Sequence, residues 1–202
     1  MLQEEKELLE KFSTLTRWMY EDAKKALFPP AMATFVVATA LFDFIEICGL
    51  FLIGPKDSTS KLTSSSARFN AFFDYLGPEY SKLRNDPLIL DVYKELRCGM
   101  SHEGLVKNRD FCILGSHKEV SDDMLRNNYY TNHTLLTPHF QRLTCGVIFN
   151  GSWIITVGIL LIHFQDAVQK LIKSIEDGSG DRRSFFEAAN HIGLSRFKIE
   201  KI

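Results

Sequence analysis

The chain has 202 residues and a formal net charge of −1. A near-neutral chain lacks the broad basic surface of proteins that bind nucleic acid through overall charge, so any contact with RNA has to be local. With 45% hydrophobic and 24% charged residues, the composition excludes a disordered chain, and the length suits one globular domain.

Residues 2–27 are expected to form an amphipathic helix. Apolar side chains recur at intervals of three or four, which places them along one side of a helix; they are Leu8, Leu9, Phe12, Leu15, Trp18, Met19, Ala23, Ala26 and Leu27. Pro29 and Pro30 then end the helix. Residues 4–7 are charged where a secretory signal would need an apolar run, so we expect a cytoplasmic protein.

The second predicted helix, residues 31–53, is apolar almost throughout and long enough to span a bilayer. It carries two carboxylates, Asp43 and Glu46, three residues apart near its middle. Each would cost about 2.5 kcal/mol or more in lipid. The central helix of a bundle can instead pair them with cations from neighbouring helices. We therefore predict a core helix and no membrane association.

Two further helices are expected after a polar linker, residues 56–66. The first, residues 67–76, is rich in phenylalanine, and a short turn over residues 79–85 follows it. Asp86 is expected to cap the second, with Pro87 at its first helical position. The core-facing residues of this second helix are Ile89, Val92, Tyr93, Leu96 and Met100.

Between residues 105 and 149 the pattern changes to that of strands. The runs 110–114 and 140–149 predict a small β-hairpin or sheet, and the polar segment 116–138 between them is expected to be a long loop, with or without a short helix.

The last long helix is predicted over residues 153–176, followed by a charged C-terminal tail, residues 177–202, with one short helix at 184–191. We therefore predict a mainly α fold. It is a single helical domain over residues 1–176, with a small β-hairpin or sheet inserted at about 105–149 before the last long helix.

The four cysteines, Cys48, Cys98, Cys112 and Cys145, lie far apart in the sequence and lack the spacing of a zinc site. This pattern favours free thiols in a reducing compartment. No metal and no other cofactor is predicted.

Chemistry concentrates at Arg97 and His102, late in the helix that follows Asp86. Arginine is a permanent cation with planar donors that match phosphate, and histidine titrates near neutral pH. The run Leu96-Arg97-Cys98-Gly99-Met100-Ser101-His102-Glu103 resembles the Arg-x4-6-His signature of HEPN domains (higher eukaryotes and prokaryotes nucleotide-binding). The resemblance covers about residues 1–104 and 150–176, with an acidic helix, a Phe-rich helix, the motif helix and a closing long helix in that order.

The resemblance implies an all-helical bundle and a metal-independent endoribonuclease. His102 would transfer protons during attack by the 2′-hydroxyl group, and Arg97 would bind the phosphate. It also implies a homodimer in which two copies of the motif face one another, with RNA as substrate and an antitoxin or another protein as partner in a toxin–antitoxin or defence system.

Seven other residues are assigned to this candidate site. Asp43 and Glu46 would orient Arg97, and Cys98, Ser101 and Glu103 are supporting residues within the motif. Lys107 and Arg109 follow closely and would extend a phosphate-binding edge for RNA.

Each assignment has a structural alternative. Arg97 could serve only as a salt bridge to Asp43 or Glu46 that closes the bundle. His102 could be a residue that interacts with the helix C-terminus, and Lys107 and Arg109 a solvated turn. Active HEPN proteins often have Asn, Asp or His after the arginine, where this chain has Cys98, a weak hydrogen-bonding group. The alternative function is a catalytically inactive HEPN-like dimer that binds RNA, a nucleotide or a protein.

Overall fold

A computed structural model of the chain confirms a mainly α fold with a small sheet. It describes residues 1–27, 33–56, 61–87, 89, 91–103, 111–114, 147–149 and 152–196, and gives the backbone alone for 101–103, 111–114, 147–149 and 152–154.

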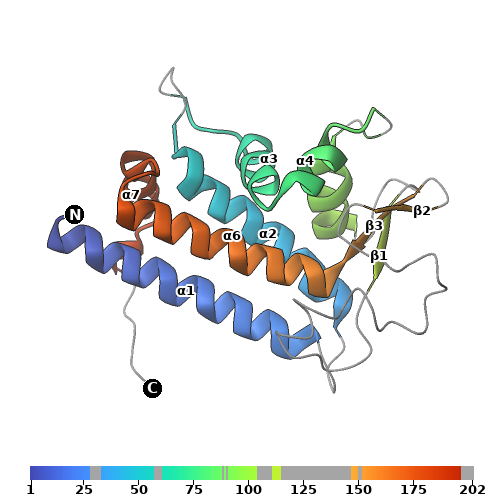
Figure 1. The fold of residues 1–202 in the computed structure, drawn as a ribbon, viewed down its shortest axis with the longest axis horizontal. Helices are drawn as coiled ribbons and strands as arrows, with labels where there is room; N and C mark the ends of the chain where they lie inside the picture. Colours follow the sequence, from blue (N-terminus) through green and yellow to red (C-terminus); the bar gives the residue numbers. More distant parts are fainter. Residues whose placement is uncertain are drawn as a thin grey trace.

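Three long helices form the centre of the fold: α1 (Gln3–Leu27), α2 (Thr34–Ile53) and α6 (Val157–Asp177). Figure 1 shows them lying side by side, and each of the three contacts the other two. A shorter helix, α7 (Arg182–His191), packs across one end of this layer, followed by a single turn, η3 (Leu194–Arg196). The small sheet lies at the opposite end, next to the start of α6 (Figure 1).

In α1, the buried residues recur every three or four positions: Leu9, Phe12, Thr16, Tyr20, Ala23 and Leu27. The predicted stripe was wrong at Trp18, which is 37% exposed, because Thr16 and Tyr20 occupy the buried side of that turn. A buried hydroxyl group needs a hydrogen-bond partner, and the Thr16 hydroxyl has one because it donates to the Phe12 carbonyl oxygen at 2.9 Å.

Helix α2 is the core helix of the fold. It contacts α1, α3, α6, α7 and η1, and Leu41, Phe42 and Ile45 are fully buried. In the described part of the chain it is also the one helix with the length and apolar composition to cross a membrane, a test that a buried core helix passes as well. Cys48 is a buried free thiol, as predicted, and burial raises the pKa of that thiol.

Helix α3 (Ser65–Tyr75) begins two residues earlier than predicted because Ser64 caps it, accepting a hydrogen bond from the Ala67 N–H at 3.1 Å. Residues predicted as a turn form a short helix, α4 (Pro78–Arg84). Proline suits the first turn of a helix, and Tyr80 and Leu83 bury one side of α4 in the core.

The motif lies in η1 (Tyr93–Glu103), which is a π-helix and not the α-helix expected from Pro87 onward. The predicted core-facing residues are correct at Ile89, Val92, Leu96 and Met100, all of which are buried. Tyr93 is only partly buried.

A three-stranded sheet has the order β1-β3-β2, formed by β1 (Phe111–Leu114), β2 (Val147–Phe149) and β3 (Ser152–Thr156). Strand β3 pairs parallel with β1 and antiparallel with β2. The sheet was predicted, but β3 occupies the residues expected to begin the last helix. Its β-branched run of Ile154, Ile155 and Thr156 favours a strand. The predicted loop, residues 116–138, lies outside the described residues.

The segment predicted as a charged tail contributes to the core. Gly178 ends α6 in a left-handed conformation (φ 81°), and Asp181 caps α7. Phe185, Ala188 and Ala189 on α7 are fully buried, and α7 contacts α2. The predicted short helix is therefore present, but it belongs to the helical domain.

Candidate functional site

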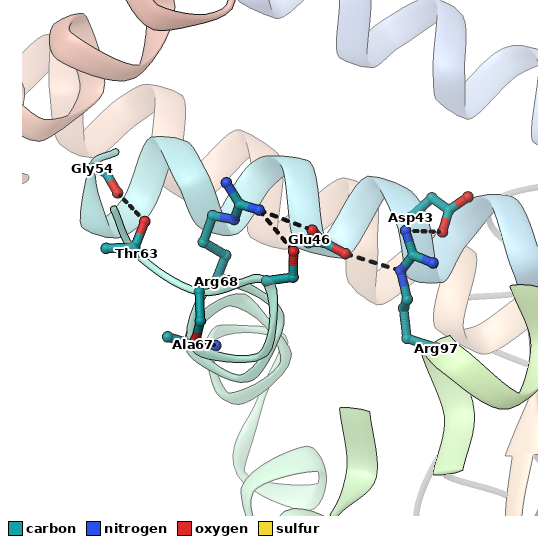
Figure 2. A network of polar contacts seen from close by, with 9 residues as sticks. Asp43, Glu46, Gly54, Thr63, Ala67, Arg68 and Arg97 are labelled. Atoms are coloured by element: carbon teal, nitrogen blue, oxygen red, sulfur yellow. Dashed lines mark hydrogen bonds and ion pairs between the residues drawn. The ribbon is translucent and has the colours of Figure 1, made fainter. Parts of the chain in front are cut away.

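Arg97 on η1 lies against the two carboxylates of α2. Its Nη2 is 3.1 Å from Oδ1 of Asp43, and its Nε donates to Oε2 of Glu46 at 2.9 Å (Figure 2). Asp43 and Glu46 are three residues apart, so both lie on one side of α2. Each therefore contacts a different nitrogen of the same guanidinium group, and this pairing, expected from the sequence, joins η1 to α2.

Glu46 is bound on both of its oxygens. While Oε2 accepts from Arg97, Oε1 accepts from Nη2 of Arg68 at 3.1 Å, and the same Arg68 nitrogen donates to Oγ of Ser65 at 2.8 Å (Figure 2). Arg68 and Ser65 lie at the start of α3. Glu46 thus ties α3 and η1 to the core helix, and we call Asp43, Glu46, Arg68 and Arg97 the arginine–carboxylate cluster.

Arg68 was not predicted as part of the site. The available signal was a single cation at the start of a Phe-rich helix, which does not identify a partner. Its position depends on the close approach of α3 to α2 at Gly49. A Cβ atom at position 49 would overlap the backbone carbonyl of Arg68, so glycine is needed there for the two helices to approach this closely.

The cluster is neutral overall and mostly shielded from water. The side chain of Glu46 is 13% exposed, and those of Arg97 and Arg68 are 21% and 23% exposed. Asp43 is the most open of the four, at 40%. Charge-assisted hydrogen bonds in such a setting are stronger than those of exposed ion pairs. Arg97 is therefore held in a fixed orientation, while 21% of its side chain remains exposed.

In η1, side chains five positions apart meet. Tyr93 is hydrogen-bonded to Cys98 and to Ser65, and its ring lies edge-on to Phe69 with centroids 5.6 Å apart. Burial is the main reason that the pKa of Tyr93 is raised, and the bond to Cys98 adds to it. The Cys98 side chain therefore contacts the Tyr93 hydroxyl group.

The spacing of the motif fits this helix type. A π-helix is built from hydrogen bonds between residues i and i+5, so backbone positions 97 and 102 lie about one turn apart in η1. In an α-helix, residues three or four apart are neighbours, and residues five apart are not. The interval of five between Arg97 and His102 thus matches one turn of η1.

The predicted site residues divide into four groups. Asp43, Glu46 and Arg97 come together, and Cys98 contacts Tyr93. The structure gives only the backbone of Ser101, His102 and Glu103, and Lys107 and Arg109 lie outside the described residues. Among the side chains that the structure describes, no three His, Cys, Asp or Glu residues are arranged to hold a metal ion.

No protein-family model matches the chain, and no curated protein and no solved structure matched it either. The resemblance to HEPN domains thus stays a prediction from the sequence motif. The arginine–carboxylate cluster is the structural feature on which a proposal for function can be based.

Proposed function

We propose that this protein is a HEPN-like, metal-independent endoribonuclease that acts in the cytoplasm as a homodimer. The observation that carries the proposal is the state of Arg97, which is oriented by two carboxylates yet remains 21% exposed. A guanidinium group fixed in this way, on a side chain that is partly exposed, is suited to binding phosphate, because it needs no reordering when the substrate arrives.

Arg97 would bind the scissile phosphate. Its Nε and Nη2 atoms contact Glu46 and Asp43. A guanidinium group has five N–H donors, so the remaining N–H groups would donate to phosphoryl oxygens. They would also stabilise the negative charge that develops on these oxygens in the phosphorane. Asp43 and Glu46 act as positioning residues in this scheme and do not touch the substrate.

His102 would transfer protons. The 2′-oxygen attacks phosphorus as its proton passes to a base, the new 2′-O–P bond forms, and the bond from phosphorus to the 5′-oxygen breaks as that oxygen is protonated. The products are a 2′,3′-cyclic phosphate and a 5′-hydroxyl end. Histidine suits either proton transfer because its ordinary pKa is about 6.5. In a two-fold dimer, one copy would supply the base and the other the acid.

A second candidate is a non-catalytic HEPN-like dimer that binds RNA, a nucleotide or a protein such as an antitoxin. Three observations favour it. Arg97 is paired with two carboxylates, which offset its charge, and Cys98 stands where active family members often have Asn, Asp or His. The Cys98 thiol, moreover, is engaged by Tyr93.

The test is cleavage of a fluorescent single-stranded RNA by purified protein in the presence of a metal chelator. We expect cleavage by the native protein and its loss in Arg97→Ala and His102→Ala. Matched controls are Arg183→Ala and His191→Ala, two exposed α7 residues outside the site, which should leave cleavage unchanged. RNA binding without cleavage would select the second candidate, and equal cleavage by all five proteins would exclude both roles for Arg97 and His102.

A further inference from the structure

Arg68 is the member of the arginine–carboxylate cluster that the proposed reaction leaves without a role. It belongs to α3, and its Nη2 donates to Oε1 of Glu46 at 3.1 Å and to Oγ of Ser65 at 2.8 Å. Its Nε is buried. Figure 2 shows Arg68 and Arg97 on opposite sides of the Glu46 carboxylate. Arg68 is therefore connected to Arg97 through Glu46, and its effect on a substrate at Arg97 is indirect.

The charge of the cluster balances only when Arg68 is included. Arg97 contacts two carboxylates, those of Asp43 and Glu46, so these three residues alone carry one net negative charge. Arg68 on Glu46 brings the cluster to neutrality. Without Arg68, the net negative charge beside Arg97 would repel the phosphates of RNA. The repulsion would be strong because Glu46 is only 13% exposed and water screens it poorly.

The bond from Arg68 also limits how Glu46 binds Arg97. Because Arg68 holds Oε1, Glu46 meets Arg97 through Oε2, which lies 2.9 Å from Nε of Arg97. A carboxylate with both oxygens free frequently binds arginine in the bidentate way, through two parallel N–H···O bonds. In that arrangement Glu46 would occupy a further N–H group of Arg97, one that a phosphate would otherwise accept from. Arg68 thus keeps donors of Arg97 available.

We propose that Arg68 is a positioning residue for phosphate binding. By holding one oxygen of Glu46 and offsetting its charge, it leaves Arg97 able to bind a phosphate of RNA. This inference rests on the proposed function, in which Arg97 binds the scissile phosphate. It predicts that the charge of Arg68 is needed only while Glu46 carries its own charge, and a double variant measures this coupling directly.

The test is binding of a fluorescent single-stranded 2′-O-methyl RNA, which has no free 2′-hydroxyl group and is not cleaved by the proposed reaction. Fluorescence anisotropy at one low salt concentration gives the dissociation constant, since phosphate contacts weaken as salt rises. In Arg68→Gln the dissociation constant should rise about fivefold or more. In Glu46→Gln/Arg68→Gln it should return to within about twofold of the native value, because the cluster is again neutral and the amide oxygen still accepts from Arg97.

A purely structural role for Arg68 gives the opposite result for the double variant. That variant loses both partners of the ion pair, so its binding would be at least as weak as that of Arg68→Gln. Arg68→Lys keeps the charge and disturbs the fold least, and its dissociation constant should stay within about twofold of the native value. Arg183→Gln removes one charge from an exposed residue of α7 and should leave binding unchanged.

Arg97→Ala separates this inference from the proposed function. It should weaken binding at least as much as Arg68→Gln does. Native affinity in Arg97→Ala, or no RNA binding by the native protein, would overturn both the proposed function and the role of Arg68. A loss in Arg97→Ala overturns the role of Arg68 alone if Arg68→Gln binds like the native protein, if the double variant does not recover, or if Arg68→Lys is as weak as Arg68→Gln.

Discussion

The Nε atom of Arg97 lies 2.9 Å from Oε2 of Glu46, and this bond connects the motif helix η1 to the core helix α2. The second oxygen of Glu46 makes the corresponding bond to Arg68 on α3. A single carboxylate thus holds two cations from two helices, and two of our predictions on stability start from it.

Replacing Glu46 with alanine should lower the free energy of unfolding by about 1–3 kcal/mol, because two largely buried arginines lose their shared partner. Urea unfolding measures the loss. The control is Glu187→Ala, which removes an exposed pair with Arg183 and should change stability by less than about 0.5 kcal/mol. Equal losses in the two variants would contradict a structural role for the cluster.

Gly49→Ala should destabilise the protein by about 1–3 kcal/mol or more, because the added methyl group meets the Arg68 carbonyl and pushes α3 away from α2. The same shift should lengthen the Glu46–Arg68 contact. Thermal unfolding tests the loss, with Val36→Ala as a control on the same helix, since Val36 is 68% exposed. A native melting temperature in Gly49→Ala would show that the two helices can separate freely.

Phe185→Ala should cost about 3–5 kcal/mol of stability, because the ring is fully buried and packs against three other rings. The centroids of Phe12 and Phe51 are each 5.1 Å away, and that of Phe186 is 5.3 Å away. Phe186→Ala is the matched control, since Phe186 is only partly buried and its loss should be smaller. Chemical unfolding of both variants decides whether α7 belongs to the core; comparable small losses would assign it to a loosely attached tail.

Asp181→Ala should lower the free energy of unfolding by about 1 kcal/mol near neutral pH, the usual loss for a helix N-cap. Hydrogen bonds from Ser184, first from its N–H and then from its hydroxyl, lower the pKa of Asp181. A carboxyl group whose pKa is lowered by folding stabilises the folded state above its unfolded pKa of about 3.9, and that contribution is lost as the pH falls through the folded value.

The difference between the native protein and Asp181→Ala should therefore shrink as the pH falls below about 4. Urea titrations near neutral pH and near pH 3 measure it. Asp181→Asn keeps a good capping group and should retain most of the stability near neutral pH. A loss in Asp181→Asn as large as in Asp181→Ala would show that capping is not the cause.

Part of this site was predictable from the sequence because charged residues inside apolar helices are conspicuous. Asp43 and Glu46 interrupt an apolar helix, and Arg97 lies beside a buried stripe, so their pairing followed from the need to neutralise them. Arg68 could not be assigned in the same way, because its contact depends on how closely α3 approaches α2 at Gly49, which is a property of the packed helices.

The differences between the predicted and the observed fold have equally local causes. An apolar run such as Trp153, Ile154 and Ile155 suits both a buried strand and a buried helix. Its β-branched residues favour the strand, and pairing with β1 and β2 stabilises it. Charged residues surround Phe185 in the sequence, so the composition of this segment indicated a tail and gave no sign of a core helix. The π-helical form of η1 had no signal in the sequence beyond the interval of five between Arg97 and His102.

The central claim is that Arg97 and His102 direct RNA cleavage through the 2′-hydroxyl group without metal. The most direct measurement is the chemistry of the product ends after incubation of the native protein with RNA in a chelator, beside the same RNA carrying a 2′-deoxy nucleotide at the cleaved position. The claim predicts 2′,3′-cyclic phosphate and 5′-hydroxyl ends, and no cleavage at the 2′-deoxy position. Products with 3′-hydroxyl ends, cleavage of the 2′-deoxy substrate, or RNA left intact would contradict it.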